Sequence, residues 1–280
     1  MRRTASVLSV SRKGPTARTA LQGALACFIA LALVGLAAAF VPEVRSVDAA
    51  ATAGWDAAGD TTFGALTRRM AHLCDAEPYC VLGVALIAIA LLRGRIARAG
   101  AVAVLLVATG LTTQLLKSSL GSPRGGQILG LELGSWPSGH ATAAMTLALC
   151  AVLVAPRAWR GLVALGGAGF ALAVGLGVLV MEWHLPTDVA GGYLVAMGWT
   201  LLAVAALRRV EGPARATAAG TSERWGWIAV AAVVGIAAAS VHVDSIASFA
   251  FDYTWATAIA ALLLVLAVAL AASLAATLRR

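Results

Sequence analysis

Residues 161–182 read GLVALGGAGFALAVGLGVLVME and carry no charged side chain before Glu182. About 20 apolar helical residues cross a bilayer, so this run is long enough to span one. Similar runs recur along the 280 residues, of which 60% are hydrophobic and 12% charged, with a mean hydropathy of +0.88. Soluble domains have about 25% charged residues and disordered chains have low hydrophobicity, so both classes are excluded. The sequence predicts an all-α fold, a polytopic membrane helical bundle.

Hydropathy on both sides of this run predicts eight membrane spans in all. They are residues 21–41, 79–93, 99–117, 138–155, 161–182, 187–207, 226–242 and 255–277. A sheet is excluded because the runs are continuous and too long for strands, and because a sheet edge in lipid would leave backbone groups unpaired. The first span is expected to stay uncleaved, because its apolar stretch exceeds the usual length of about 7–15 residues in a signal peptide.

The net charge of +8 is explained by membrane topology, because the basic residues are distributed unevenly among the segments between the spans. With the N-terminus in the cytoplasm, the inner segments hold 16 of the 21 Lys and Arg residues. The outer segments hold the other five, which are Arg45, Arg68, Arg69, Lys117 and Arg124. This distribution predicts that both termini are cytoplasmic. It gives no indication of a nucleic-acid partner and leaves the oligomeric state open.

Two cations and a predicted helix start lie at the outer ends of the third and fourth spans. Lys117 ends the third span and Arg124 follows it, a pair suited to an oxyanion such as phosphate. Ser138 and Gly139 open the fourth span, where unpaired backbone N–H groups and the helix dipole also favour an anion. Gly139 has no side chain, so an oxyanion can approach its backbone closely.

Two histidines and a carboxylate lie at the same outer ends. His140 is in the first turn of the fourth span and is placed to protonate a leaving oxygen. His184 and Asp188 are four residues apart at the start of the sixth span, so the carboxylate can hold one ring nitrogen while the other attacks. Together with the cations, these residues predict a phosphoryl-transfer site that needs no metal and no other cofactor.

Three motifs in this order resemble those of the type 2 phosphatidic acid phosphatase (PAP2) superfamily of membrane lipid phosphatases. Six residues separate Lys117 from Arg124, Pro-Ser-Gly-His stands at 137–140, and three residues separate His184 from Asp188. The resemblance implies that His184 forms a phosphohistidine, that Asp188 orients it and that His140 is the general acid. It also implies the residues that hold the phosphoryl oxygens, which are Lys117, Arg124, Ser138 and Gly139.

The resemblance further implies how the chain is organised. A PAP2-like core of six spans covers 21–207, after a basic cytoplasmic N-terminus at 1–20. A cytoplasmic linker follows at 208–225, and two additional spans lie within 226–280.

The chain departs from the superfamily's motifs at two places. Gly125 stands where the first motif has proline, and Gly177-Val178 stands where the third has Ser-Arg, so one phosphate-binding cation of the family is missing. Arg68 and Arg69 in the first outer loop are candidate substitutes, although the interpretation of both as solvated loop charges is favoured.

The function that the resemblance implies is hydrolysis of a lipid phosphomonoester or diphosphate at the outer face of the bacterial cytoplasmic membrane. The expected partners are this lipid phosphate and the membrane lipids. Two alternatives stay open: a phosphotransferase of the same superfamily, and a lipid-phosphate binder or transporter without turnover.

Three further features are interpreted from sequence alone. Cys74 and Cys80 bracket a polar segment outside the membrane and could form a disulfide in an oxidising compartment. His72 has no motif context and is predicted to be a surface residue. Close helix packing is predicted for the glycines of the fifth span, which are Gly166, Gly167, Gly169, Gly175 and Gly177.

Overall fold

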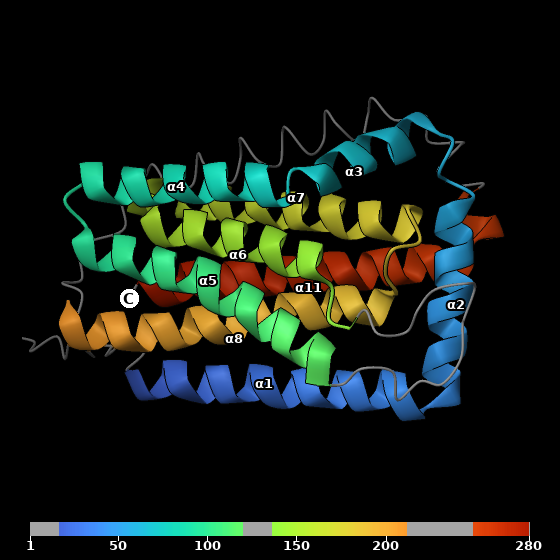
Figure 1. The fold of residues 1–280 in the computed structure, drawn as a ribbon, viewed down its shortest axis with the longest axis horizontal. Coiled ribbons are helices and arrows are strands. Elements are labelled where there is room, and N and C mark those ends of the chain that lie inside the picture. Colours follow the sequence, from blue (N-terminus) through green and yellow to red (C-terminus); the bar gives the residue numbers. More distant parts are fainter. Residues whose placement is uncertain (1–16, 120–135, 212–248, 280) are drawn as a thin grey trace, which may run out of the picture.

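The computed structural model describes residues 17–119, 136–211 and 249–279, which are helical except for short turns (Figure 1). These residues contain no strand, and the predicted all-α membrane bundle is confirmed. The helices are α1 (Ala17–Phe40), α2 (Pro42–Asp56), α3 (Thr62–His72), α4 (Ala76–Leu92), α5 (Ile96–Ser119), α6 (Gly139–Val154), the 3-10 turn η1 (Arg157–Trp159), α7 (Arg160–Val180), α8 (Pro186–Val210) and α11 (Thr254–Arg279).

Seven of the eight predicted spans coincide with helices, and the remaining one, 226–242, lies outside the described residues. Among the described helices, α1, α5, α7, α8 and α11 are each long and apolar enough to cross a membrane. The pair α3 and α4 passes the same test together, with a bend of 66° between them. The remaining apolar helix, α6, has 16 residues, and its side chains are almost all buried among its neighbours.

The segment between the first two predicted spans, expected to be an outer loop, folds into the helices α2 and α3. Pro42 opens α2, where its missing N–H is harmless, and Glu43 adds an acid to the first turn. Thr61 caps α3, because its Oγ1 accepts the Gly64 N–H at 3.1 Å. In Figure 1, α2 lies across one end of the bundle, on the side where α3 begins.

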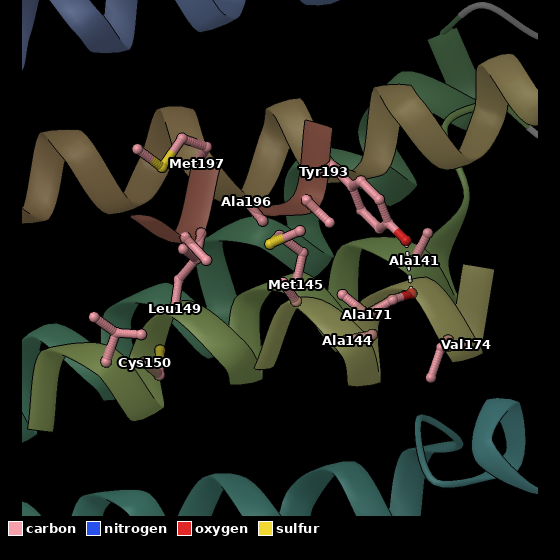
Figure 2. Close-up of a cluster of buried hydrophobic side chains, with 14 of the residues drawn as sticks. Ala141, Ala144, Met145, Leu149, Cys150, Ala171, Val174, Tyr193, Ala196 and Met197 are labelled. Atoms are coloured by element: carbon pink, nitrogen blue, oxygen red, sulfur yellow. Dashed lines mark hydrogen bonds between the residues drawn. The ribbon is translucent and has the colours of Figure 1, made fainter. Parts of the chain in front are cut away.

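The core is built around α6, which packs against α4, α5, α7, α8 and α11. Figure 2 shows Met145 and Leu149 of α6 facing Tyr193 and Met197 of α8. The fully buried Tyr193 hydroxyl donates to the Ala171 carbonyl of α7 at 2.6 Å, so its one polar group is satisfied. This packing fixes α7 and α8 against α6, which sets the positions of their ends.

Hydroxyl groups join α5 and α6 inside the bundle. Thr146 Oγ1 donates to Thr109 Oγ1 at 3.2 Å, and Thr113 Oγ1 lies 3.5 Å from Thr142 Oγ1. Thr109, Thr113 and Thr142 also donate to the carbonyls four residues earlier in their own helices. In lipid a hydroxyl without a partner is costly, so these threonines lie where two helices face each other.

The end of the bundle opposite α2 is held by arginines. Arg160 donates to the Leu278 carbonyl at 2.7 Å and Arg208 to the Thr277 carbonyl at 2.7 Å, so both satisfy last-turn carbonyls of α11. Since α11 also packs against α2, α6, α7 and α8, this predicted additional span belongs to the bundle.

At the same end, Arg98 forms two hydrogen bonds of 3.0 Å with the Glu211 carboxylate. These hydrogen bonds hold the pKa of Glu211 below its usual value. The pair ties the start of α5 to the residue that follows α8.

Glycines allow close approach at some of the predicted positions of α7 but not at all of them. A Cβ on Gly177 would collide with the Thr67 carbonyl of α3, and a Cβ on Gly175 would lie 2.7 Å from the Tyr193 hydroxyl. Gly167 likewise faces Ala148 at 2.8 Å. Gly166 and Gly169 do not show this close packing, because a Cβ at either position would meet no atom of the described residues within 4 Å.

We therefore expect opposite results from two alanine substitutions in α7. Gly177→Ala should lower the unfolding temperature in detergent, because α3 must move away from α7, a change typically worth about 1–3 kcal/mol. Gly166→Ala, the matched control, should leave the unfolding temperature unchanged or raise it, since alanine favours the helix by up to about 1 kcal/mol. Equal effects would contradict the contact between α3 and α7.

Candidate active site

The predicted nucleophile and its partner form a buried pair at the start of α8. His184 Nδ1 lies 3.3 Å from Asp188 Oδ2, and the side chains are 8% and 0% exposed. The same oxygen accepts the Leu185 N–H at 3.2 Å, so Asp188 also caps the helix that carries it. A carboxylate can only accept, so Nδ1 carries the proton and Nε2 keeps a lone pair for attack.

The turn that presents His184 is fixed by the way α7 ends. The Glu182 N–H bonds to the Leu179 carbonyl and the Trp183 N–H to the Val178 carbonyl, both at 3.0 Å, which is a Schellman motif. Glu182 takes the left-handed position with φ of 53°, where glycine is usual. The backbone then reverses at once into α8, so His184 is held directly between the two helix ends.

The predicted oxyanion site lies at the first turn of α6. Ser138 is the N-cap and its Oγ accepts the Ala141 N–H at 3.3 Å. The N–H groups of Gly139 and His140 come earlier in the helix and have no carbonyl to bond within it. Lys117 Nζ lies 3.8 Å from the position that a Cβ on Gly139 would occupy, so its positive charge adds to that of the helix start.

The first turns of α6 and α8 are joined directly through the backbone. The Ser138 N–H donates to the Asp188 carbonyl at 2.9 Å. Gly192 permits this approach, because a Cβ there would lie 2.8 Å from the Ser138 carbonyl. The Asp188 carboxylate also interacts electrostatically with Lys117. The structure thus brings together the described residues of the three motifs, which lie at the end of α5 and at the starts of α6 and α8.

The structure describes some, but not all, of the residues named in the predictions about phosphate-binding cations. Arg124 and Gly125 lie outside the described residues. Val178, at the place of the missing family arginine, is fully buried. Arg68 donates to the Gly59 carbonyl at 2.8 Å and so holds the turn between α2 and α3, whereas Arg69 is exposed.

Asp48 of α2 is a residue of this region that the motifs do not include. Its carboxylate is buried and accepts two hydrogen bonds from Thr187, from the N–H at 3.2 Å and from the hydroxyl at 2.6 Å. Thr187 stands between His184 and Asp188, so α2 fixes the first turn of α8 from outside. Sequence offers no signal for this contact, because its partners lie 139 positions apart in the chain.

A second unpredicted contact involves Asp75, in the turn between α3 and α4. Asp75 Oδ1 lies 3.0 Å from His140 Nε2, and Oδ2 lies 3.0 Å from His72 Nδ1. These hydrogen bonds, first that of His140 and then that of His72, hold the pKa of Asp75 below its usual value. His72 is on the surface as predicted, but it contributes to this cluster.

Trp183 is the aromatic residue next to the predicted nucleophile. Its ring centroid lies 5.3 Å from that of His140 and 5.7 Å from that of His72. Trp183 therefore brings the turn between α7 and α8 into contact with His140 on α6 and with His72 at the end of α3.

The sequence leaves open whether Cys74 and Cys80 form a disulfide, and the structure contains no bond between them. Cys74 and Cys80 are both free thiols, the first buried beside Asp75 and the second exposed on α4. Burial raises the pKa of the Cys74 thiol to about 12, which makes it unreactive at neutral pH.

Helices that suit a membrane and a histidine–carboxylate pair at a helix start define an integral membrane protein with a candidate phosphoryl-transfer site. Residues 98–211 match the model of the PAP2 superfamily, and this match supports membership of that superfamily. The matched residues cover α5 except for its first two residues, all of α6 to α8 and every described residue of the three motifs. The superfamily suggests a phosphatase-type activity. No curated protein and no solved structure matches the chain.

We expect Asp48→Ala to weaken the first turn of α8. The variant leaves two donors of Thr187 without their carboxylate, and an unsatisfied, largely buried donor typically costs about 1–3 kcal/mol. The measurement is thermal unfolding in detergent, compared with Glu43→Ala, which removes an exposed acid from the same helix. Equal unfolding temperatures for the two variants would contradict the role of Asp48.

Proposed function

We propose that the protein is a membrane phosphatase that hydrolyses a lipid phosphomonoester or diphosphate through a phosphohistidine at His184. The observation that carries the proposal is the buried His184–Asp188 pair, because a fixed imidazole with one engaged nitrogen is suited to nucleophilic attack. Membership of the PAP2 superfamily supports a phosphoric-ester hydrolase in general terms.

In the first step, Nε2 of His184 attacks phosphorus and the bond from phosphorus to the leaving oxygen breaks. The proposed acid is His140, which gives its proton to that oxygen. The charge on the phosphoryl oxygens is offset by Lys117 and by the N–H groups at the start of α6. Asp188 stabilises the charge that develops on His184 and keeps its ring oriented.

In the second step, water attacks phosphorus and the bond between phosphorus and His184 breaks. His140, now neutral, takes the proton of the water, so inorganic phosphate leaves and both histidines return to their starting state. Arg124 is proposed to help hold phosphate, as the superfamily's first motif implies. Ser138 is proposed to act mainly as the cap that exposes the N–H groups of α6, since its side chain is buried and bonded to Ala141.

A lipid is the favoured substrate class because the proposed site lies at the ends of the helices that suit a membrane. The ends of α5 and α7 and the starts of α6 and α8 meet there, so a headgroup can reach His184 while its chains stay beside the bundle. Metal is not needed in this proposal, because cations and helix N–H groups neutralise the phosphoryl charge.

The first test uses the purified protein with phosphatidic acid, phosphatidylglycerophosphate, a polyprenyl diphosphate and a phosphorylated glycolipid. At least one of them should release phosphate, vanadate should inhibit the reaction, and EDTA should leave it unchanged. His184→Ala should lose nearly all turnover while its unfolding temperature stays close to that of the wild type, and Asp60→Asn serves as a control on an exposed acid.

Other outcomes of this test would change the conclusion. Full activity of His184→Ala, or complete loss with EDTA, would overturn the histidine mechanism. Transfer of the phosphoryl group to another lipid, without release of phosphate, would indicate a phosphotransferase. Binding of the lipids without any turnover would indicate a binder or transporter.

We propose that the site faces the outside of the cytoplasmic membrane and that both termini lie inside. The support is the separation of charges, because Lys117 and the histidines lie at one end of the bundle and Arg98, Arg160 and Arg208 lie at the other. Segments rich in arginine stay in the cytoplasm.

Labelling of Cys80 tests this orientation. A membrane-impermeant maleimide added to intact cells should label the exposed Cys80 without prior reduction, and Cys80→Ser should abolish the label. Cys74 should contribute little, because its thiol is buried and has a raised pKa. Labelling that appears only after the cells are broken would place the site on the cytoplasmic side.

A further inference from the structure

One side-chain cluster beside the proposed site joins His140 to three residues that have no role in the mechanism derived so far. It consists of Asp75, His72, His140 and Trp183, which come from the turn before α4, the end of α3, the first turn of α6 and the turn after α7. Asp75 is central, because each of its carboxylate oxygens lies 3.0 Å from a different imidazole.

The geometry assigns the tautomer of His140. Asp75 is ionised at neutral pH, since its pKa lies below the usual value, so its carboxylate only accepts hydrogen bonds. Nε2 of His140 therefore carries a hydrogen and donates a hydrogen bond to Asp75. The other nitrogen, Nδ1, remains for the leaving oxygen. Trp183 lies against the His140 ring with its centroid 5.3 Å away, which limits the rotation of the imidazole.

We propose that Asp75 is the positioning residue for His140 and that it stabilises the protonated imidazole from which the leaving group takes its proton. This inference rests on the proposed function and goes beyond the three motifs, because Asp75 lies 65 residues before His140 and outside residues 98–211. His72 holds the second oxygen of Asp75 and so fixes the carboxylate in place.

The arrangement repeats on the acid what Asp188 does for the nucleophile. In both cases a carboxylate binds one imidazole nitrogen and leaves the other to react. The environments differ, because the Asp188 side chain is fully buried whereas that of Asp75 is 47% exposed. Solvent weakens the pull of Asp75, so its loss should cost less than loss of His140 itself.

The test compares two substrates in Asp75→Asn. The first is the phosphomonoester lipid of the panel above that is hydrolysed fastest, whose alkoxide needs a proton to leave, and the second is para-nitrophenyl phosphate, whose phenolate leaves without one. We compare kcat/KM, which reports the step that transfers the phosphoryl group to His184, because the later attack of water is common to both substrates. A general acid is typically worth about 10²–10⁴-fold, so we expect kcat/KM on the lipid to fall by about 10-fold. The kcat/KM on para-nitrophenyl phosphate should stay within about 2-fold, because its leaving group needs no acid in that step.

Two controls separate positioning from a general loss of structure. Asp60→Asn removes an exposed carboxylate from the turn between α2 and α3 and should leave both rates unchanged. Adding Asp75→Asn to His140→Gln should have almost no further effect on kcat/KM for the lipid, because a positioning residue acts only through the residue that it holds. The unfolding temperature of each variant shows whether it is folded, and Asp75→Glu replaces Asp75→Asn if the latter is not.

A fall of equal size on both substrates, or a full further loss in the His140→Gln background, would overturn the inference while leaving the phosphatase intact. Unchanged lipid turnover in Asp75→Asn would overturn it as well. Failure of the proposed function gives a different result, because the wild type would then release no phosphate or His184→Ala would stay active. In that case the assignment of Asp75 falls together with the phosphatase.

Discussion

The backbone hydrogen bond from Ser138 to the Asp188 carbonyl is the contact on which the site depends. It joins the first turns of α6 and α8, so the helix start that favours an anion lies next to the His184–Asp188 pair. Gly192 makes the contact possible, because any side chain there would collide with the Ser138 carbonyl and with Thr142. Lys117 approaches the same turn from α5. A buried carboxylate, a cation and the first N–H groups of α6, which have no carbonyl to bond within the helix, are thus held together by rigid elements, as preorganised electrostatic stabilisation requires.

The bilayer explains where the polar groups of the remaining structure lie. Lipid offers no hydrogen bonds, so the threonines of α5 and α6 bond to carbonyls of their own helices and to each other. At the helix ends, Arg160 and Arg208 satisfy carbonyls of α11, which also fixes that helix to the bundle. The residues of the proposed site lie at the opposite end, where α5 and α7 end and α6 and α8 begin.

The segment 42–75 acts as an outer layer that supports this end. Asp48 of α2 holds Thr187, and Asp75 holds His140, so each of the two histidine-bearing turns has a carboxylate partner from outside the family region. Neither contact belongs to a motif. Asp48 lies on α2 and Asp75 lies in the turn between α3 and α4, and these helices pack against α6, α7 and α8. The layer thus links residues distant in sequence to the proposed nucleophile and acid, which is why mutations in it test the mechanism.

The fold class, the places of the described spans and the His184–Asp188 pair could be predicted from the sequence, because they depend on local patterns: apolar length, and a spacing of four residues at a helix start. The sequence does not reveal that residues 42–72 form two helices rather than a loop. Nor does it reveal that Gly177 packs against Thr67, whereas no described atom lies within 4 Å of a Cβ placed on Gly166. Only the tertiary structure decided the partners Asp48 and Asp75 and the free state of Cys74 and Cys80. The reason is physical: a single carboxylate or thiol carries no periodic signal, and its partner is set by how helices distant in sequence pack.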